Sequence, residues 1–269
     1  MLIKNLTFLT LSTLIIVSLG CDDQKRSSDA KVVTLPGQNE LKIAERDKSG
    51  FVMIDVKGGD FIMGGNDNVD DGGSPELRIA DECPHEVTIK DFSIGKYEVT
   101  GADWVAIMGT NPSKHNDCED CPVEQVSWDD IQEFIRKLNL KYDESYRLPT
   151  EEEWEFAAKG GTKSKNHVYA GSNNAAEVAW FERNSENVSH PVGLLRSNEL
   201  GIFDMSGNIW EWCSNAKKPY PCDEIGKTFE SKVLRGGSFG HRIQSVRIID
   251  RNGRGSSLRL PTLGFRLAK

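Results

Sequence analysis

Basic residues are scarce in this sequence of 269 amino acids, which has 33 Lys and Arg against 41 Asp and Glu. The net charge of −8 disfavours nucleic acid as a partner, because contacts with phosphates need clustered Lys and Arg. No internal repeat of fixed period is visible either. Hydrophobic residues make up 38% of the chain and charged residues 28%, which is typical of a globular protein and argues against general disorder.

Long apolar runs are also scarce, and the one at the start of the chain is short for a membrane span. It covers residues 6–17, after the single charge of Lys4. The run Ser18-Leu19-Gly20-Cys21 that follows resembles the cleavage box of bacterial lipoproteins. We therefore interpret residues 1–20 as a lipoprotein signal peptide and Cys21 as the residue that receives the lipid. An ordinary secretory signal, cleaved nearby, is the alternative.

Aromatic residues are absent from residues 22–48, which are rich in Asp, Gln, Lys, Ser and Glu. Such a composition buries too little surface to fold, so the sequence predicts a flexible tether over residues 21–50 and one folded domain over residues 51–269. About 250 residues are enough for a sizeable core. The expected location is the bacterial cell envelope, outside the cytoplasm, with membrane lipid as the partner of Cys21.

Helices are expected at only three places in the folded part, each with a capping residue before an apolar pattern. The expected N-caps and helix ends are Thr100 with Met108, Ser127 with Leu140, and Thr150 with Gly160. Short strands are predicted within residues 51–65 and 85–97, and only short strands separated by turn residues after residue 166. This pattern favours one α+β domain with long loops.

Seven short segments of the chain resemble one known family in content and order, among them Arg-Gly-Gly-Ser-Phe at residues 235–239. The full set is residues 58–64, 96–100, 122–128, 146–155, 200–212, 235–239 and 263–266. The family is that of the formylglycine-generating enzyme, or sulfatase-modifying factor, domain. The resemblance implies a C-type-lectin-like α+β fold with few helices, short strands and long loops.

The cysteine pair that the family's oxidases use is missing from this chain. In those enzymes two cysteines, five residues apart, follow the Gly-Gly-Ser motif and bind copper(I), which prefers soft thiolate ligands. Here the two positions fall on His241 and Val246, and no cysteine occurs after Cys222. The sequence therefore predicts that oxidation of a peptide cysteine to formylglycine is absent and that copper is not bound.

Other reactive groups lie in the same region of the sequence. His241, Glu211 and Ser238 are the candidates for a different chemistry, although a histidine in a loop is also an ordinary surface residue. The predicted binding cleft contains Trp210, Ser238, His241, Arg242, Arg247 and Arg251. Its arginines would bind an anion or a carboxylate, or would instead pair with the surplus acidic residues of the chain.

A calcium site is implied by the resemblance at residues 204–211. The family's ligands correspond here to the carboxylates of Asp204 and Glu211 and to the backbone carbonyls of Gly207 and Ile209. Oxygen ligands of this kind suit calcium. The alternative is that both carboxylates bond to loop amides.

Cysteines are few, and their expected pairing follows from an extracytoplasmic location. Cys118 and Cys121 are expected to form a small disulfide loop, and Cys213 is expected to pair with Cys222. Cys83 is then left unpaired and buried. A zinc site of Cys83, His85, Cys118 and Cys121 and a set of free thiols are the alternatives.

Three functions remain open on the sequence alone. The first is a membrane-anchored binding or scaffold module, with a peptide, an envelope protein or a glycan as its ligand. The second is an enzyme with a divergent activity in the same cleft. The third, a formylglycine-generating oxidase, is disfavoured by the missing cysteines.

Overall fold

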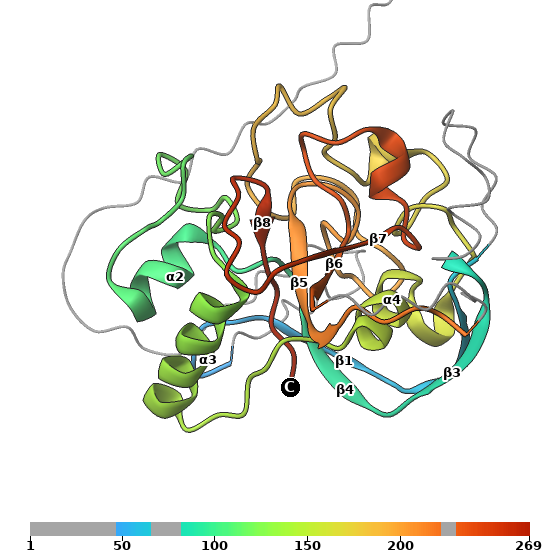
Figure 1. Ribbon diagram of the computed structural model, residues 1–269, viewed down its shortest axis with the longest axis horizontal. Coiled ribbons are helices and arrows are strands. Elements are labelled where there is room, and N and C mark those ends of the chain that lie inside the picture. Colours follow the sequence, from blue (N-terminus) through green and yellow to red (C-terminus); the bar gives the residue numbers. More distant parts are fainter. Residues whose placement is uncertain (1–46, 66–81, 222–229) are drawn as a thin grey trace, which may run out of the picture. The chain divides into compact units, whose positions relative to one another are not determined.

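We describe a computed structural model of the chain for residues 47–65, 82–221 and 230–269; the predicted signal, Cys21 and most of the tether lie outside these residues. A long antiparallel ribbon opens the fold (Figure 1). Strand β1 (Met53–Val56) pairs with β4 (Phe92–Gly95), and β2 (Gly59–Met63) pairs with β3 (His85–Ile89). Gly58 separates β1 from β2 where a Cβ would lie 2.2 Å from the Ile89 carbonyl oxygen, so only glycine fits there.

A four-stranded sheet forms the centre of the domain, with the strand order β7-β6-β5-β8. Its strands are β5 (Trp210–Ala216), β6 (Lys232–Arg235), β7 (Arg251–Arg254) and β8 (Leu263–Gly264). Neighbouring strands are antiparallel except for the short parallel pair of β5 and β8. The sheet therefore joins segments that are far apart in the sequence.

Within the part of the chain that the structure describes in full, three helices surround this sheet, and they begin where the sequence predicts. They are α2 (Gly101–Met108), α3 (Trp128–Tyr142) and α4 (Glu151–Ala158). Each has a complete capping box, in which the side chains of Thr100, Ser127 and Thr150 accept the backbone N–H three residues on. Single 3-10 turns follow at Gly161–Lys163, Ala175–Glu177 and Ile243–Val246. The predicted α+β fold with few helices, short strands and long loops is confirmed.

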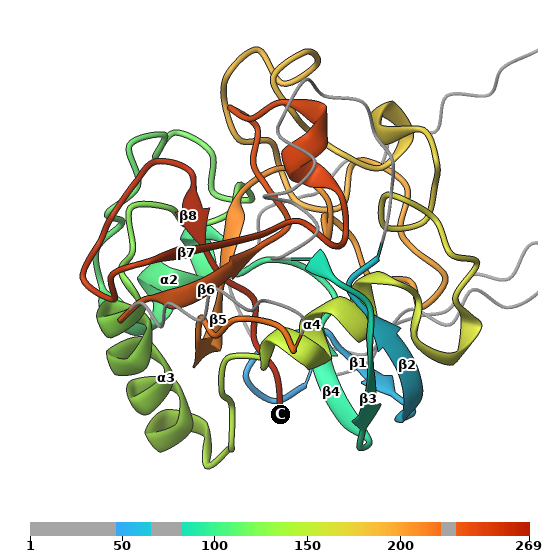
Figure 2. The ribbon, with the colours of Figure 1, turned by 45° about the vertical axis from the view of Figure 1, so that its right-hand side comes forward.

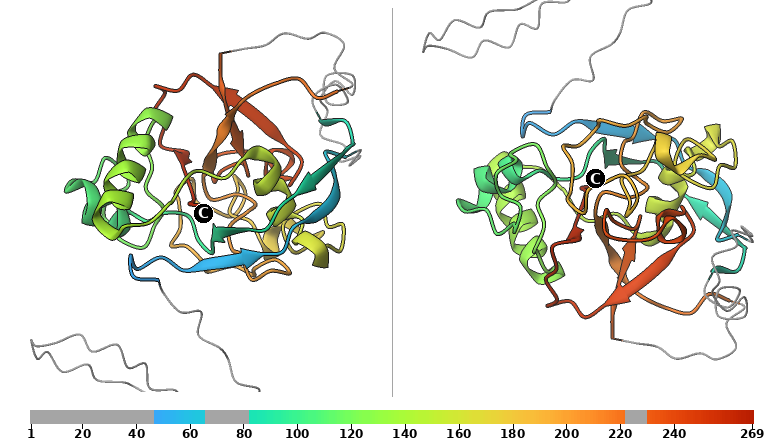
Figure 3. Two further views of the ribbon diagram at one scale, coloured as in Figure 1. Left: turned by 90° about the horizontal axis from the view of Figure 1, so that it is seen from below. Right: turned by 90° about the horizontal axis from the view of Figure 1, so that it is seen from above.

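Alternation along the central strands divides the core between two helices. Trp212 of β5 and Leu234 of β6 pack in one cluster with Phe134 of α3. Cys213 and Val233, the adjacent residues on the same strands, pack in another cluster with Trp154 of α4. Helices α3 and α4 accordingly lie on either side of β5 and β6 (Figures 2 and 3). Both faces of the sheet are buried, which explains why these strands are apolar on successive residues.

The two ends of the described domain meet beside the ribbon. Gly95 donates its N–H to the Leu267 carbonyl, and Lys269 donates its N–H to that of Ser93, so the last residues run along β4 (Figure 3). The Lys269 ammonium lies 3.1 Å from the Asp47 carboxylate, which also accepts a hydrogen bond from the Tyr146 hydroxyl. Among the described residues, no helix is long and apolar enough to cross a membrane.

Candidate functional site

Three residues of the predicted cleft are in contact. The Gly236-Gly237 pair has positive φ angles of 92° and 74°, and this turn brings Ser238 beside His241. Ser238 Oγ and His241 Nδ1 are hydrogen-bonded at 2.6 Å, and the His241 ring meets the edge of Trp210 at a centroid distance of 5.6 Å. Burial and the charge of Arg254 lower the pKa of His241, so the ring is neutral at pH 7. Ser238 is fully buried and is therefore not presented as a nucleophile.

The positions of the family's two thiols are occupied by groups that cannot replace them. His241 holds Ser238, and Val246 is fully buried in a separate apolar cluster with Tyr169 and Phe181. Valine has no atom that can bind a metal. The described part of the chain has one free thiol, Cys213, which is fully buried in the core. A two-thiolate copper site therefore has no counterpart at this turn.

Two arginines that the sequence analysis placed in the cleft are instead in buried ion pairs, so that prediction is wrong for them. Arg247 binds the carboxylate of Glu82 at 2.8 and 3.1 Å, and Arg251 binds that of Glu151 at 2.7 and 2.8 Å. Both side chains are almost fully buried. The surplus of acidic residues supplies partners inside the protein, which neutralises the guanidinium groups that an anionic ligand would need. Arg242 is exposed.

The segment proposed for calcium encloses a buried group of carboxylates. Asp204, Gly207 and Asn208 all have positive φ angles, so the backbone curls there. Glu211 is held by Arg266 through two bonds of 2.7 Å and by the Trp154 indole N–H at 2.7 Å. Asp204 accepts the N–H of Gly193 at 2.7 Å.

Glu98 is the third carboxyl group of this cluster, and it was not predicted as a site residue. Its carboxylate accepts bonds from the Asn208 side chain at 2.6 Å and from the Ile209 N–H at 3.3 Å. Burial, with the charges of Asp204 and Glu211, holds the pKa of Glu98 well above its usual value. Burial raises the pKa of Asp204 to about 6. Three carboxylates thus surround one guanidinium, that of Arg266, and leave a surplus of buried negative charge.

A hollow of about 410 Å³ is lined in part by Glu98 and was not predicted. It is bounded by the residues before β1, the first turn of α2 and the loop around residue 192. Its lining residues are Gly50, Phe51, Val52, Gly95, Tyr97, Glu98, Val99, Thr100, Ala102, Asp103, Asp120, Pro191, Val192, Leu194 and Leu267. Three of them are acidic and none is Lys or Arg. At its rim Leu194 is 61% exposed. The hollow thus joins apolar walls to negative charge.

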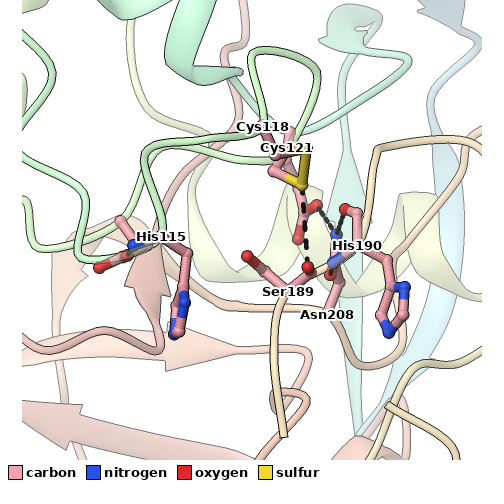
Figure 4. Close-up of a disulfide and its surroundings, with 8 residues drawn as sticks. His115, Cys118, Cys121, Ser189, His190 and Asn208 are labelled. Atoms are coloured by element: carbon pink, nitrogen blue, oxygen red, sulfur yellow. Dashed lines mark hydrogen bonds between the residues drawn. A yellow bond between two sulfur atoms is a disulfide. The ribbon is translucent and has the colours of Figure 1, made fainter. Parts of the chain in front are cut away.

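One disulfide lies beside this hollow, between Cys118 and Cys121, as the sequence analysis predicts. Cys121 is buried and its Sγ lies 3.7 Å from the Ser189 carbonyl oxygen (Figure 4). The rings of His115 and His190 belong to the same surroundings but point away from the sulfur atoms (Figure 4). The disulfide lies within the loop after α2, and the contact of Cys121 with Ser189 places it against the loop that precedes Asp204.

The other cysteine predictions are wrong. Cys213 does not pair with Cys222, because it is a free thiol on the face of β5 that packs against α4, and burial raises its pKa. Cys222 itself lies outside the described residues. Cys83 is disulfide-bonded instead of unpaired. The zinc alternative also fails, since the sulfur atoms of Cys83, Cys118 and Cys121 are all in disulfides.

Comparison with known proteins identifies the family. The profile of the "Sulfatase-modifying factor enzyme 1-like domain" matches residues 37–269. The "Chaperone protein LppX" of Paenibacillus barcinonensis is 33% identical over 74% of this chain and 87% of its own length. The "Inactive C-alpha-formylglycine-generating enzyme 2" of Mus musculus is 30% identical over 80% of this chain and 85% of its own. The structure of "Treponema denticola variable protein 1" superposes with a TM-score of 0.70 at 28% identity, over 81% of this chain and 94% of that one. The chain therefore belongs to the sulfatase-modifying factor domain family.

Proposed function

We propose that this protein is a binding module for polypeptides, without formylglycine-generating activity, that a lipid on Cys21 holds on the outer side of a bacterial membrane. The observation that carries the proposal is the hollow beside Glu98, which combines apolar walls with the carboxylates of Asp103 and Asp120 and has no basic lining residue. Such a surface suits a segment in which Lys or Arg alternates with apolar side chains. Of the ligands that the sequence left open, a polypeptide fits this chemistry better than a glycan.

The relatives support the same direction. One is named a chaperone and another an inactive member of the enzyme family, and both align with most of this chain. An enzyme that uses Ser238 or Glu211 is not favoured, because both side chains are fully buried and already hydrogen-bonded. His241 alone is a poor catalyst, because Ser238, the nucleophile beside it, is closed off from a substrate by burial.

Replacing Asp120 with Asn should weaken binding of a basic, apolar peptide by about threefold, which is the size expected for one exposed charge contact. The measurement is fluorescence anisotropy with a labelled peptide of alternating Lys and Leu. Asp117→Asn is the matched control, because Asp117 is exposed in the same loop but does not line the hollow. A peptide of alternating Glu and Leu should bind far more weakly than the Lys peptide.

Equal binding of the two peptides, with no effect of Asp120→Asn, would contradict a polypeptide site in the hollow. Tight stoichiometric binding of copper(I), with conversion of a peptide cysteine to an aldehyde, would overturn the absence of oxidase activity. Neither result requires the identity of the natural ligand.

Calcium is the second element of the proposal. Asp204 and Glu211 would supply carboxylate oxygens, and Gly207 and Ile209 would supply backbone carbonyls. Backbone ligands are necessary, since within residues 47–65, 82–221 and 230–269 no three His, Cys, Asp or Glu side chains form a metal-binding group. The surplus negative charge around Glu98 supports a cation here, because a divalent ion would neutralise it. The ion would hold the loop between β5 and the hollow in one conformation.

Calcium at a hundred times its dissociation constant should raise the melting temperature by about 5–10 °C. The effect of Asp204→Asn on stability should have opposite signs with and without calcium. Without the ion the variant should be more stable than the native chain, because one buried charge is removed; with the ion it should be less stable. Calorimetry with and without a chelator measures both. Identical melting curves for the native chain in the two buffers would count against the site.

A further inference from the structure

The two cysteines of the Cys118–Cys121 disulfide differ in exposure. Cys118 is partly exposed, whereas Cys121 is only 4% exposed. An external thiolate therefore approaches the disulfide from the side of Cys118, which makes Cys121 the leaving group. This asymmetry, with two residues between the cysteines, is what a thiol–disulfide exchange reaction requires.

The backbone of the turn does not depend on the S–S bond. The N–H of Cys121 donates to the Cys118 carbonyl at 3.3 Å. The carbonyls of Cys121 and Glu119 accept the N–H groups of Gly101 and Ala102 at 2.9 and 3.0 Å, at the start of α2. The Asp120 carbonyl accepts from Val192 at 3.0 Å. Four backbone hydrogen bonds thus keep the turn in place when the disulfide opens.

The reduced form of Cys121 also has a partner in position. Its Sγ lies 3.7 Å from the Ser189 carbonyl oxygen, so a thiol at this position would donate an S–H hydrogen bond. In the same residue the Ser189 hydroxyl is buried and makes no hydrogen bond with the protein. The site therefore offers the Ser189 carbonyl to the Cys121 side chain that is released.

Charge around the exposed sulfur selects the thiol that attacks it. Asp117, Glu119 and Asp120 are exposed in the same turn. These carboxylates repel an anionic thiol and attract a cationic one, and the effect acts on the rate of encounter.

We propose that Cys118–Cys121 is a thiol–disulfide exchange site for cysteine thiols in positively charged surroundings. The incoming thiolate attacks Cys118 Sγ, the S–S bond breaks, and a mixed disulfide forms at Cys118. The electron pair leaves on Cys121 Sγ, which takes a proton from solvent; attack of Cys121 on the mixed disulfide reverses the step. This activity is separate from peptide binding in the hollow, and small thiols test it without any peptide.

The experiment compares cysteamine, a cationic thiol, with glutathione, an anionic one, at equal thiolate concentrations. Mass spectrometry of the quenched native protein follows the mixed disulfide at Cys118. At low salt cysteamine should react about ten times faster than glutathione, and 0.5 M NaCl should reduce this ratio to near one. The change Glu119→Gln with Asp120→Asn should lower the ratio at low salt, while Lys114→Gln is the control for loss of a nearby charge of opposite sign and should raise it.

The proposal is overturned if the Cys118–Cys121 disulfide opens only when the protein unfolds. Equal reaction rates of cysteamine and glutathione at low salt would also overturn the proposal, since the acidic residues would then not select between thiols by charge. In the variant Cys121→Ser, cystamine should form a stable mixed disulfide with Cys118. If the variant is folded and forms no mixed disulfide, a thiolate does not attack Cys118.

Discussion

Replacing Arg235 with Met should lower the free energy of unfolding by about 3–5 kcal/mol, because it removes a buried counter-charge from Glu155 and Glu151 and leaves only Lys159 and Arg251 to balance them. Arg235 is fully buried, pairs with Glu155, and has its Nε 3.5 Å from Glu151. Its guanidinium also donates to the carbonyls of Ile249 and Asp250 at 3.0 and 2.7 Å. One side chain thus connects β6 with α4 and with the segment before β7.

Urea denaturation measures this loss, and Arg254→Met is the matched control. Arg254 lies on the neighbouring strand β7 but is exposed, so its replacement should change stability by less than about 0.5 kcal/mol. Adding Glu155→Gln to Arg235→Met should restore part of the loss, since the buried charge that has lost one of its two partners is then removed. A similar small loss for both arginine variants would show that the network contributes little.

The loss should also depend on pH. Burial alone would raise the pKa of Glu155, but the charges of Arg235 and Lys159 outweigh it, and the pKa lies below its usual value. The stabilisation is therefore complete above the unfolded-state pKa of Glu and fades as the pH falls through the folded-state value. In Arg235→Met the carboxyl gains a proton more easily. The free energies of unfolding of the native chain and of Arg235→Met should converge in acid and differ most near neutral pH.

Replacing Gly237 with Ala should cost about 3 kcal/mol or more and should separate Ser238 from His241. Gly237 has a φ of 74°, and an added Cβ would lie 2.2 Å from the Ser245 carbonyl oxygen. Backbone atoms must move to remove that clash, and the turn that carries His241 is the part that can shift.

Gly240→Ala is the control for Gly237→Ala. Gly240 lies in the same turn, but the nearest atom to an added Cβ is 3.6 Å away, which is ordinary contact. Its stability should be close to that of the native chain. The separation is visible as a rise in the pKa of His241 by NMR, since a less buried ring is easier to protonate. Unchanged melting of Gly237→Ala would show that the 236–246 segment moves freely.

Local signals in the sequence were enough to predict the helices. Thr100, Ser127 and Thr150 each act within one turn of their own helix, so position and function follow from neighbouring residues alone. The spacing of Cys118 and Cys121 is equally local, and their pairing was predicted correctly. The resemblance to the family then supplied the fold, because its motifs are spread over the whole domain.

Partners that are distant in the sequence could not be predicted in this way. Arg247 pairs with a carboxylate 165 residues away and Arg251 with one 100 residues away, so their sequence neighbours suggested an open cleft. Cys213 was assigned to a disulfide because Cys222 is near it in sequence. On strand β5, however, the Cys213 side chain points into the core. The hollow beside Glu98 is likewise built from five separate segments, and only its residues within the family motif at 96–100 were a signal for it.

The residues after β7 have a consequence for how the protein reaches its folded state. Leu263 and Gly264 pair with β5, Arg266 binds Glu211, and Ala268 bridges to Ile94 and Arg147. Contacts of three earlier parts of the chain thus cannot form until residues 263–268 are available. A chain emerging from a ribosome or a translocation channel cannot close its core until this segment is free. The order of synthesis therefore keeps the core open until residues 263–268 have emerged.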